Sequence, residues 1–156
     1  MRKFITLSLF LCITILTNAQ SVVISQVYGG GGNTGAQFTN DYVELYNPTN
    51  APINIGDWQI AYASSTGTSW TNKTRIPAGT IIASKKYFLI QQGAGAASPA
   101  PLPAPDLVPT TTQGVINMSG TAGKVALVND TTTLAVSTTP TPVVNPNTSV
   151  TGAVID

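Results

Sequence analysis

The sequence has no histidine, a single cysteine and few charged residues, and each shortage excludes a class of chemistry. Without histidine there is no Ser-His-Asp triad, and the commonest general base near neutral pH is missing. The cysteine, Cys12, lies in the apolar N-terminal segment described below. A chain processed after that segment would therefore have no disulfide, no thiolate nucleophile and no conventional zinc site.

Charged residues make up only 8% of the chain, with seven Lys and Arg against six Asp and Glu. Two of the basic residues, Arg2 and Lys3, precede the apolar segment, which leaves five beyond it (7 − 2 = 5). A domain that binds nucleic acid needs a stripe of Lys and Arg, and no strong basic patch is visible. Nucleic acid nevertheless stays among the partners considered, together with extracellular glycans and a fused enzymatic domain.

The N-terminus has the organisation of a secretory signal peptide. Arg2 and Lys3 are basic, residues 4–16 are apolar apart from Thr and Ser, and small or polar residues stand before Gln20. The apolar run is shorter than the ~20 residues of a membrane span. We therefore expect residues 1–19 to be a signal peptide, the protein to be secreted, and the mature chain to have no transmembrane segment. A retained membrane anchor is the alternative.

The rest of the chain has the two-residue alternation of β-strands. In the clearest example, Val43 and Leu45 face one way, while Tyr42, Glu44 and Tyr46 face the other. Several short segments of this kind, separated by turn residues, predict an all-β sandwich or barrel without a convincing helix. The segments are 22–28, 41–46, 53–55, 58–62, 86–90 and 125–128.

Three other segments are predicted to be loops. Gly29–Gly32 lacks the GK[ST] ending of a phosphate-binding loop and is interpreted as a flexible connection between strands. Residues 93–109, rich in Ala, Pro and Gly, are predicted to form a long surface loop, and residues 131–151 a Thr- and Pro-rich excursion. The ending Val154-Ile155-Asp156 resembles the middle of a strand. We therefore expect an incomplete last strand and a domain truncated at its C-terminus.

The carboxylates offer little catalytic chemistry. Asp41 and Glu44 are three residues apart, so on a strand they point to opposite faces and cannot form a close acid–base pair. The other Asp residues, such as Asp57 and Asp106, stand singly beside turn residues, where Asp commonly stabilises turns. A calcium site around Asn40 and Asp41 is an alternative, but the dense carboxylate run that calcium favours is absent. We expect no metal, no cofactor and no enzymatic activity, with a carboxylate-based hydrolase as a further alternative.

The two tryptophans receive different interpretations. Trp58 alternates with Ile60 and Tyr62 and is predicted to belong to the core. Trp70 lies in a polar loop, residues 64–74, and is the candidate ligand-binding residue, because an exposed indole can stack on a sugar or a base. Packing of Trp70 over the end of a sheet is the alternative.

Several motifs, in order along residues 22–128, resemble the lamin tail domain family in its bacterial secreted form. The most specific is ELYNP at residues 44–48, followed by INIGDW at residues 53–58. The resemblance implies an immunoglobulin-like β-sandwich without a shared catalytic site. The Gly-rich loop before Asp41 resembles the variant found ahead of secreted nuclease domains, whose catalytic residues lie in a separate domain. Where this chain has Gln26, a common family pattern has an acidic residue.

These observations together predict a non-catalytic lamin-tail-like domain over residues 20–156 of a secreted bacterial protein, acting as a binding module or a spacer. The alternative is the N-terminal accessory domain of a secreted nuclease whose catalytic domain is not in this chain. The sequence does not identify the ligand, the oligomeric state or the export route.

Overall fold

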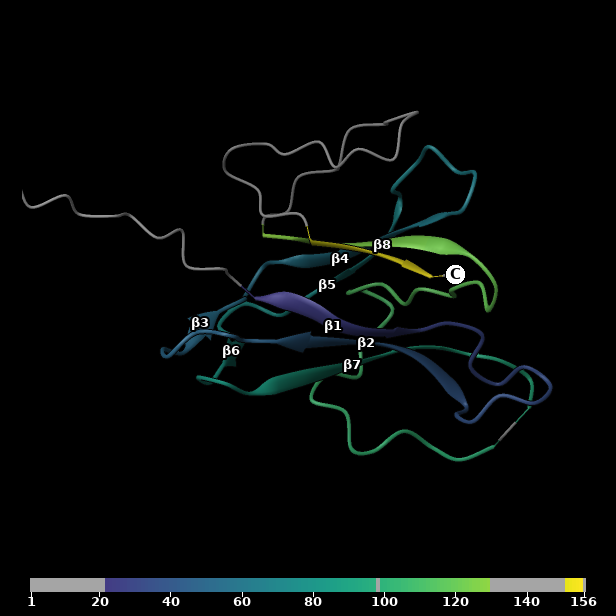
Figure 1. Cartoon of the computed structure of the whole chain (residues 1–156), viewed down its shortest axis with the longest axis horizontal. Coiled ribbons are helices and arrows are strands. Elements are labelled where there is room, and N and C mark those ends of the chain that lie inside the picture. Colours follow the sequence, from purple (N-terminus) through teal and green to yellow (C-terminus); the bar gives the residue numbers. More distant parts are fainter. Residues whose placement is uncertain (1–21, 98, 130–150, 156) are drawn as a thin grey trace, which may run out of the picture.

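The computed structural model describes residues 22–97, 99–129 and 151–155, the last five by their backbone alone. Across these ranges the regular structure is entirely β, arranged as two packed layers (Figure 1). The expected signal peptide and nearly all of the predicted excursion at 131–151 lie outside the described residues. Within the described ranges, no helix is long and apolar enough to cross a membrane.

Each layer is an antiparallel sheet, and together they form the immunoglobulin-like sandwich that the alternation predicted. One sheet has the order β1-β2-β7 and the other the order β5-β4-β8-β9, while β3 and β6 form a small separate pair. The first sheet contains β1 (Val23–Tyr28), β2 (Asn40–Tyr46) and β7 (Tyr87–Ala94). The second contains β4 (Gln59–Ser64), β5 (Asn72–Arg75), β8 (Gly123–Val128) and β9 (Thr151–Ile155), and the small pair is β3 (Ile53–Asn54) with β6 (Ile81–Ile82).

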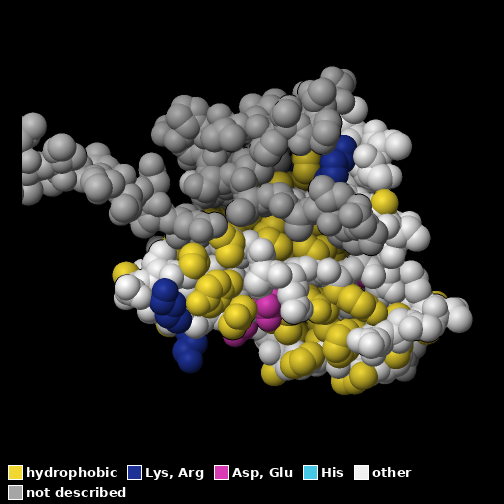
Figure 2. Space-filling view, viewed as in Figure 1, with side chains coloured by type: hydrophobic (Ala, Val, Ile, Leu, Met, Phe, Trp, Pro, Cys, Tyr) yellow, Lys and Arg dark blue, Asp and Glu magenta, His cyan; other side chains and the backbone are white. Residues whose placement is uncertain are grey.

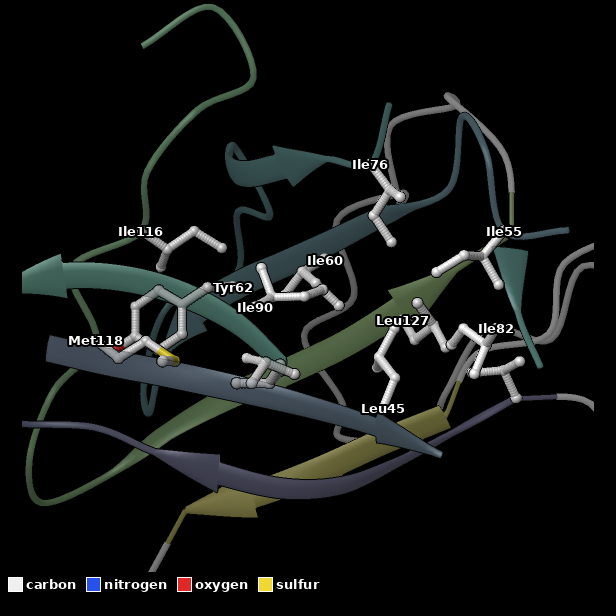
Figure 3. Packing of buried hydrophobic residues seen from close by; sticks show 13 residues of the cluster. Leu45, Ile55, Ile60, Tyr62, Ile76, Ile82, Ile90, Ile116, Met118 and Leu127 are labelled. Atoms are coloured by element: carbon white, nitrogen blue, oxygen red, sulfur yellow. The ribbon is translucent and has the colours of Figure 1, made fainter. Parts of the chain in front are cut away.

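The core lies between the two sheets and is built by the inward positions of the strands (Figure 3). Leu45 of β2, Ile60 of β4 and Leu127 of β8 are fully buried there. Full burial of one such side chain contributes ~1.5–3 kcal/mol. Trp58, which was predicted to be a core residue, is only partly buried and packs against this cluster, as does Phe88. The two-residue alternation therefore identified the inward faces of these strands correctly.

Residues 72–75 form β5, although the sequence predicted a polar loop over 64–74. The strand pairs with β4, with Thr74 opposite Ile60. All four of its residues are polar, and Thr74 alone is buried. An edge strand with so little apolar content gives no alternation to recognise, which explains why the loop prediction was wrong there.

The long connection between β7 and β8 covers open edges of both sheets. Gln91 N donates to Leu107 O at 2.9 Å and Gly93 N donates to Ile116 O at 2.8 Å, both along β7. Arg75 N of β5 donates to Gln113 O at 2.8 Å. The predicted surface loop at 93–109 thus begins inside β7 and then returns to pair with it. Because these groups of β7 are occupied, its edge does not offer the unpaired backbone that invites strand addition, and at β5 the connection occupies the amide of Arg75.

The glycine run packs tightly against three other segments. A Cβ on Gly31 would lie 2.1 Å from the carbonyl carbon of Asn40, and one on Gly29 would lie 2.2 Å from the carbonyl oxygen of Ser119. Gly32 meets the backbone of Gly95, where an added Cβ would lie 2.6 Å away. The loop was correctly placed between two strands, but close packing rather than flexibility accounts for its glycines.

Candidate ligand-binding face

The outer surface of the β1-β2-β7 sheet carries a concentration of aromatic side chains. Since Val43 and Leu45 point into the core, their neighbours on β2 point outward. In Figure 2, hydrophobic side chains cover much of the surface where Figure 1 shows β1, β2 and β7, and an acidic group lies among them. We define the aromatic face by the rings of Tyr28, Phe38, Tyr42, Tyr46 and Tyr87, with Ser25, Gln26, Glu44, Leu89 and Gln91 between them.

Three rings form a rigid cluster at one end of the face. Tyr28 and Tyr42 are directly paired across β1 and β2, and their rings stack with centroids 5.4 Å apart. Phe38 meets both edge-on, at 5.7 Å and 6.1 Å. Such offset and edge-on pairs are favourable arrangements of aromatic quadrupoles. The cluster therefore has a fixed shape before any ligand binds.

The two tyrosine hydroxyl groups of this cluster are fixed by hydrogen bonds. Tyr28 Oη accepts a hydrogen bond from Gln37 N at 3.0 Å, and Tyr42 Oη donates to Gln26 Oε1 at 3.0 Å. Burial, followed by the negative charge of Glu44, raises the pKa of the Tyr42 hydroxyl. The Tyr42 hydroxyl consequently stays protonated and remains the donor to Gln26.

Two more rings stand at the other end of the face. Tyr46 and Tyr87 are paired across β2 and β7, with ring centroids 4.7 Å apart and planes inclined by 32°. Tyr87 is 58% exposed, which makes it one of the most exposed large apolar side chains among the described residues. Tyr42 and Tyr46 are four residues apart on one strand, so the two aromatic groups are ~13 Å apart.

A β-bulge gathers polar groups between the two aromatic ends. The register between β1 and β2 shifts at Ser25, so that Ser25 and Gln26 both stand beside Glu44. Ser25 Oγ donates to Glu44 Oε1 at 2.6 Å. Bulges often re-aim side chains next to functional sites. The middle of the aromatic face therefore presents a hydroxyl, an amide and a carboxylate, and the amide is hydrogen-bonded to Tyr42.

Asp41 points the opposite way from Glu44, as their spacing predicted. Its side chain is 4% exposed, and its carboxylate oxygens accept hydrogen bonds from Gly31 N at 2.6 Å and Met118 N at 2.7 Å. Asp41 thus ties the glycine run to the connection before β8. No group of three or more His, Cys, Asp or Glu able to hold a metal ion occurs among the described residues.

The family scan identifies the domain. A model described as Lamin Tail Domain matches residues 16–141, which is most of the chain. The chain belongs to the lamin tail domain family. No curated protein matched it significantly. The immunoglobulin-like β-sandwich and the family expected from the ELYNP and INIGDW motifs are both confirmed.

The ELYNP motif of this lamin tail domain has a structural role centred on Asn47. Its side chain is fully buried, and its Nδ2 donates toward the carbonyl oxygens of Ala51, Ile82 and Ala83 at 2.8–3.1 Å. Its Oδ1 accepts from Thr49 N at 2.9 Å. Asn47 thereby closes the turn after β2 and fastens it to β6. The most recognisable motif in the sequence therefore specifies the turn after β2, and its Glu44 and Tyr46 also belong to the aromatic face.

Trp70, the residue that the sequence singled out for ligand binding, lies on the other sheet of the lamin tail domain. It is half-buried and packs against Ala61, Ala126 and Val128, which form a second, smaller apolar cluster. These positions alternate with Ile60 and Leu127, which point into the main core, so the small cluster occupies the outer side of the β4-β8 pair. Trp70 and the aromatic face are thus on opposite outer surfaces and do not form one site.

Replacement of Trp70 by Ala is expected to lower stability. The indole covers three small buried side chains, so its removal would return apolar surface to water at a cost of about 2 kcal/mol. Urea denaturation followed by tyrosine fluorescence and circular dichroism would measure the change. An unchanged denaturation midpoint, together with loss of binding to a ligand, would instead support the stacking role that the sequence suggested for Trp70.

One part of the aromatic face can be recognised in the sequence, namely the alternating residues Tyr42, Glu44 and Tyr46. Tyr42, Glu44 and Tyr46 were correctly assigned to the outward side of a strand, yet aromatic residues on the solvent side of a sheet are a candidate recognition surface in their own right. The contributions of Tyr28, Phe38 and Tyr87 could not be recognised, because they depend on which strands pair and in which register.

Proposed function

We propose that this lamin tail domain is a non-catalytic ligand-binding module of a secreted bacterial protein. The observation that carries the proposal is the aromatic face, where five rings and a bulge with three polar side chains lie on the outer surface of one sheet. Tyr and similar rings supply large contact area at low entropic cost. A pure spacer would gain nothing from a partly exposed surface of this kind.

Three of the described carboxylates stabilise the fold, which supports the non-catalytic part of the proposal. Asp41 binds backbone amides, Asp57 forms an ion pair of 2.6 Å with Arg75, and Asp106 Oδ2 accepts from Leu89 N at 2.7 Å. Asp57 also has a positive φ of 67°, which is the conformation of a turn residue. Of the four described carboxylates, Glu44 is the one on the aromatic face, and a lone carboxylate lacks the partner that acid–base catalysis requires.

The test is a binding and activity screen on the purified full chain. Glycans, double-stranded DNA and isolated bacterial cell walls would be offered in pull-down assays, and panels of esters, glycosides and phosphodiesters would be assayed for hydrolysis. We expect saturable binding to at least one material and no turnover. Turnover that is lost in a Glu44→Gln variant would refute the non-catalytic role, and saturable binding to none of the materials would favour a spacer.

The alternative, an accessory domain ahead of a secreted nuclease domain, stays a prediction. Its motivation was the glycine-rich loop, and the packing of Gly31 and Gly32 explains that loop through the fold alone. The genomic sequence downstream of codon 156 tests it directly. A stop codon there, with no nuclease sequence in any reading frame beyond it, would end this alternative.

A further inference from the structure

We propose that the aromatic face binds an uncharged, hydroxyl-rich polysaccharide, with the chain of sugars running along β2 from the Tyr42 end to the Tyr46 end. This inference rests on the proposed binding function and names its ligand class. It combines the ring pairs at the two ends with Glu44 and Gln26 between them.

Apolar and polar side chains alternate along the aromatic face. A sugar ring has apolar C–H faces and a rim of hydroxyl groups, so its binding sites combine aromatic surface with side-chain acceptors and donors. Here Tyr87 offers an exposed ring at one end, and Glu44 offers two acceptor oxygens in the middle. Ser25 occupies one lone pair of the Glu44 carboxylate, and the others remain for ligand hydroxyls.

The charge of the aromatic face also favours an uncharged ligand. The ten residues of the aromatic face include one carboxylate and no Lys or Arg. Polymers with a phosphate backbone are bound mainly through Lys and Arg, so a face that contains Glu44 and neither of these residue types is poorly matched to nucleic acids and phosphate-rich polymers. An uncharged polysaccharide meets no such penalty.

A peptide strand cannot add at the β7 edge of this sheet, and a second copy of the chain is disfavoured. Peptides that add to a sheet need an open edge, and the β7 edge is already paired by Leu107 and Ile116. Two copies joined symmetrically through this face would bring the two Glu44 carboxylates toward each other in a dehydrated contact. Like charges placed so closely are unfavourable.

The experiment measures binding of the full chain to cellulose, xylan, laminarin and chitin, by pull-down for the insoluble polymers and affinity electrophoresis for the soluble ones. Tyr87→Ala is expected to weaken binding by roughly tenfold, since it removes an exposed stacking surface. Glu44→Gln keeps the size of the side chain and the acceptor for Ser25, and is expected to weaken binding roughly fivefold.

Ile81→Ala is the matched control. Ile81 is 59% exposed, close to the 58% of Tyr87, but it belongs to β6 and lies outside the aromatic face. The Ile81→Ala variant is expected to bind the polysaccharide with the same affinity as the parent chain. Circular dichroism and thermal unfolding of all three variants would verify that each is folded, and because Tyr87 and Ile81 are exposed, replacing them removes little buried surface.

The outcomes separate this inference from the proposed function. Binding to a polysaccharide that Tyr87→Ala and Glu44→Gln weaken, and Ile81→Ala does not, supports both. Binding to DNA, to a proline-rich peptide or to a second copy of the chain, without binding to any polysaccharide, overturns the inference and leaves the binding function standing. Polysaccharide binding that only Trp70→Ala abolishes also overturns it, because the ligand would then lie on the other sheet.

Discussion

Gly31→Ala is expected to prevent stable folding of the domain, because the added methyl group would collide with main-chain atoms. The ideal Cβ lies 2.1 Å from the carbonyl carbon of Asn40 and 2.3 Å from the nitrogen of Asp41. Overpacking against side chains costs ~1–3 kcal/mol, and here the neighbours are backbone atoms of β2 that cannot rotate away. A loss of more than about 3 kcal/mol would consume much of the stability of a typical domain.

The measurement is the free energy of unfolding in urea, with Gly35→Asn as the control. Gly35 belongs to the same glycine-rich segment and has a φ of 83°, but nothing lies within 4 Å of its ideal Cβ. Asn tolerates positive φ better than other non-Gly residues, so this change should cost no more than about 1 kcal/mol. Equal stability of the two variants would show that the glycine run is loosely attached, contrary to the packing described above.

The sequence predicted the sandwich well because its core strands are regular. The alternation placed Val43 and Leu45 on one face of a strand, and both are fully buried, as are Ile60 and Leu127 in two other predicted strands. The aromatic pairs that form across neighbouring strands could not be predicted in this way. That Tyr28 faces Tyr42, and Tyr46 faces Tyr87, follows from strand pairing, which residue order alone does not specify.

The environment of Trp70, the candidate binding residue, also depends on contacts that the local sequence does not specify. Trp70 was chosen because it stands among polar residues, a local property that suggests exposure. The structure places it over Ala61, Ala126 and Val128, which are far from it in sequence or separated by a turn. Whether a loop tryptophan reaches a hydrophobic cluster depends on the packing of β5 and β8, and no local pattern encodes that.

Asp41→Asn is expected to destabilise the domain by about 2 kcal/mol at neutral pH, since the buried carboxylate accepts hydrogen bonds on both oxygens. An Asn side chain has one acceptor oxygen and one NH₂ group, so either Gly31 N or Met118 N would face a donor and lose its partner. The glycine run and the connection before β8 would then be less firmly joined. Thermal and urea unfolding would measure the loss.

The pH dependence of this difference provides a sharper test. Burial raises the pKa of the Asp41 carboxyl, although the hydrogen bonds from Met118, Gly31 and Gly30 act in the opposite direction. A raised pKa means that the folded state holds the proton more tightly than the unfolded state. The contribution of Asp41 to folding is therefore most favourable below the unfolded pKa, and it declines as pH rises through the folded pKa.

The Asn variant has no titrating group at this position, so subtracting its unfolding free energy from that of the parent isolates Asp41. The other carboxylates are common to both proteins and largely cancel in the difference. We expect the deficit of the Asn variant to be larger at pH 4 than at pH 7. A deficit that shrinks on acidification would mean that the amide hydrogen bonds outweigh burial, so that Asp41 is a carboxylate stabilised in its charged form by the glycine run.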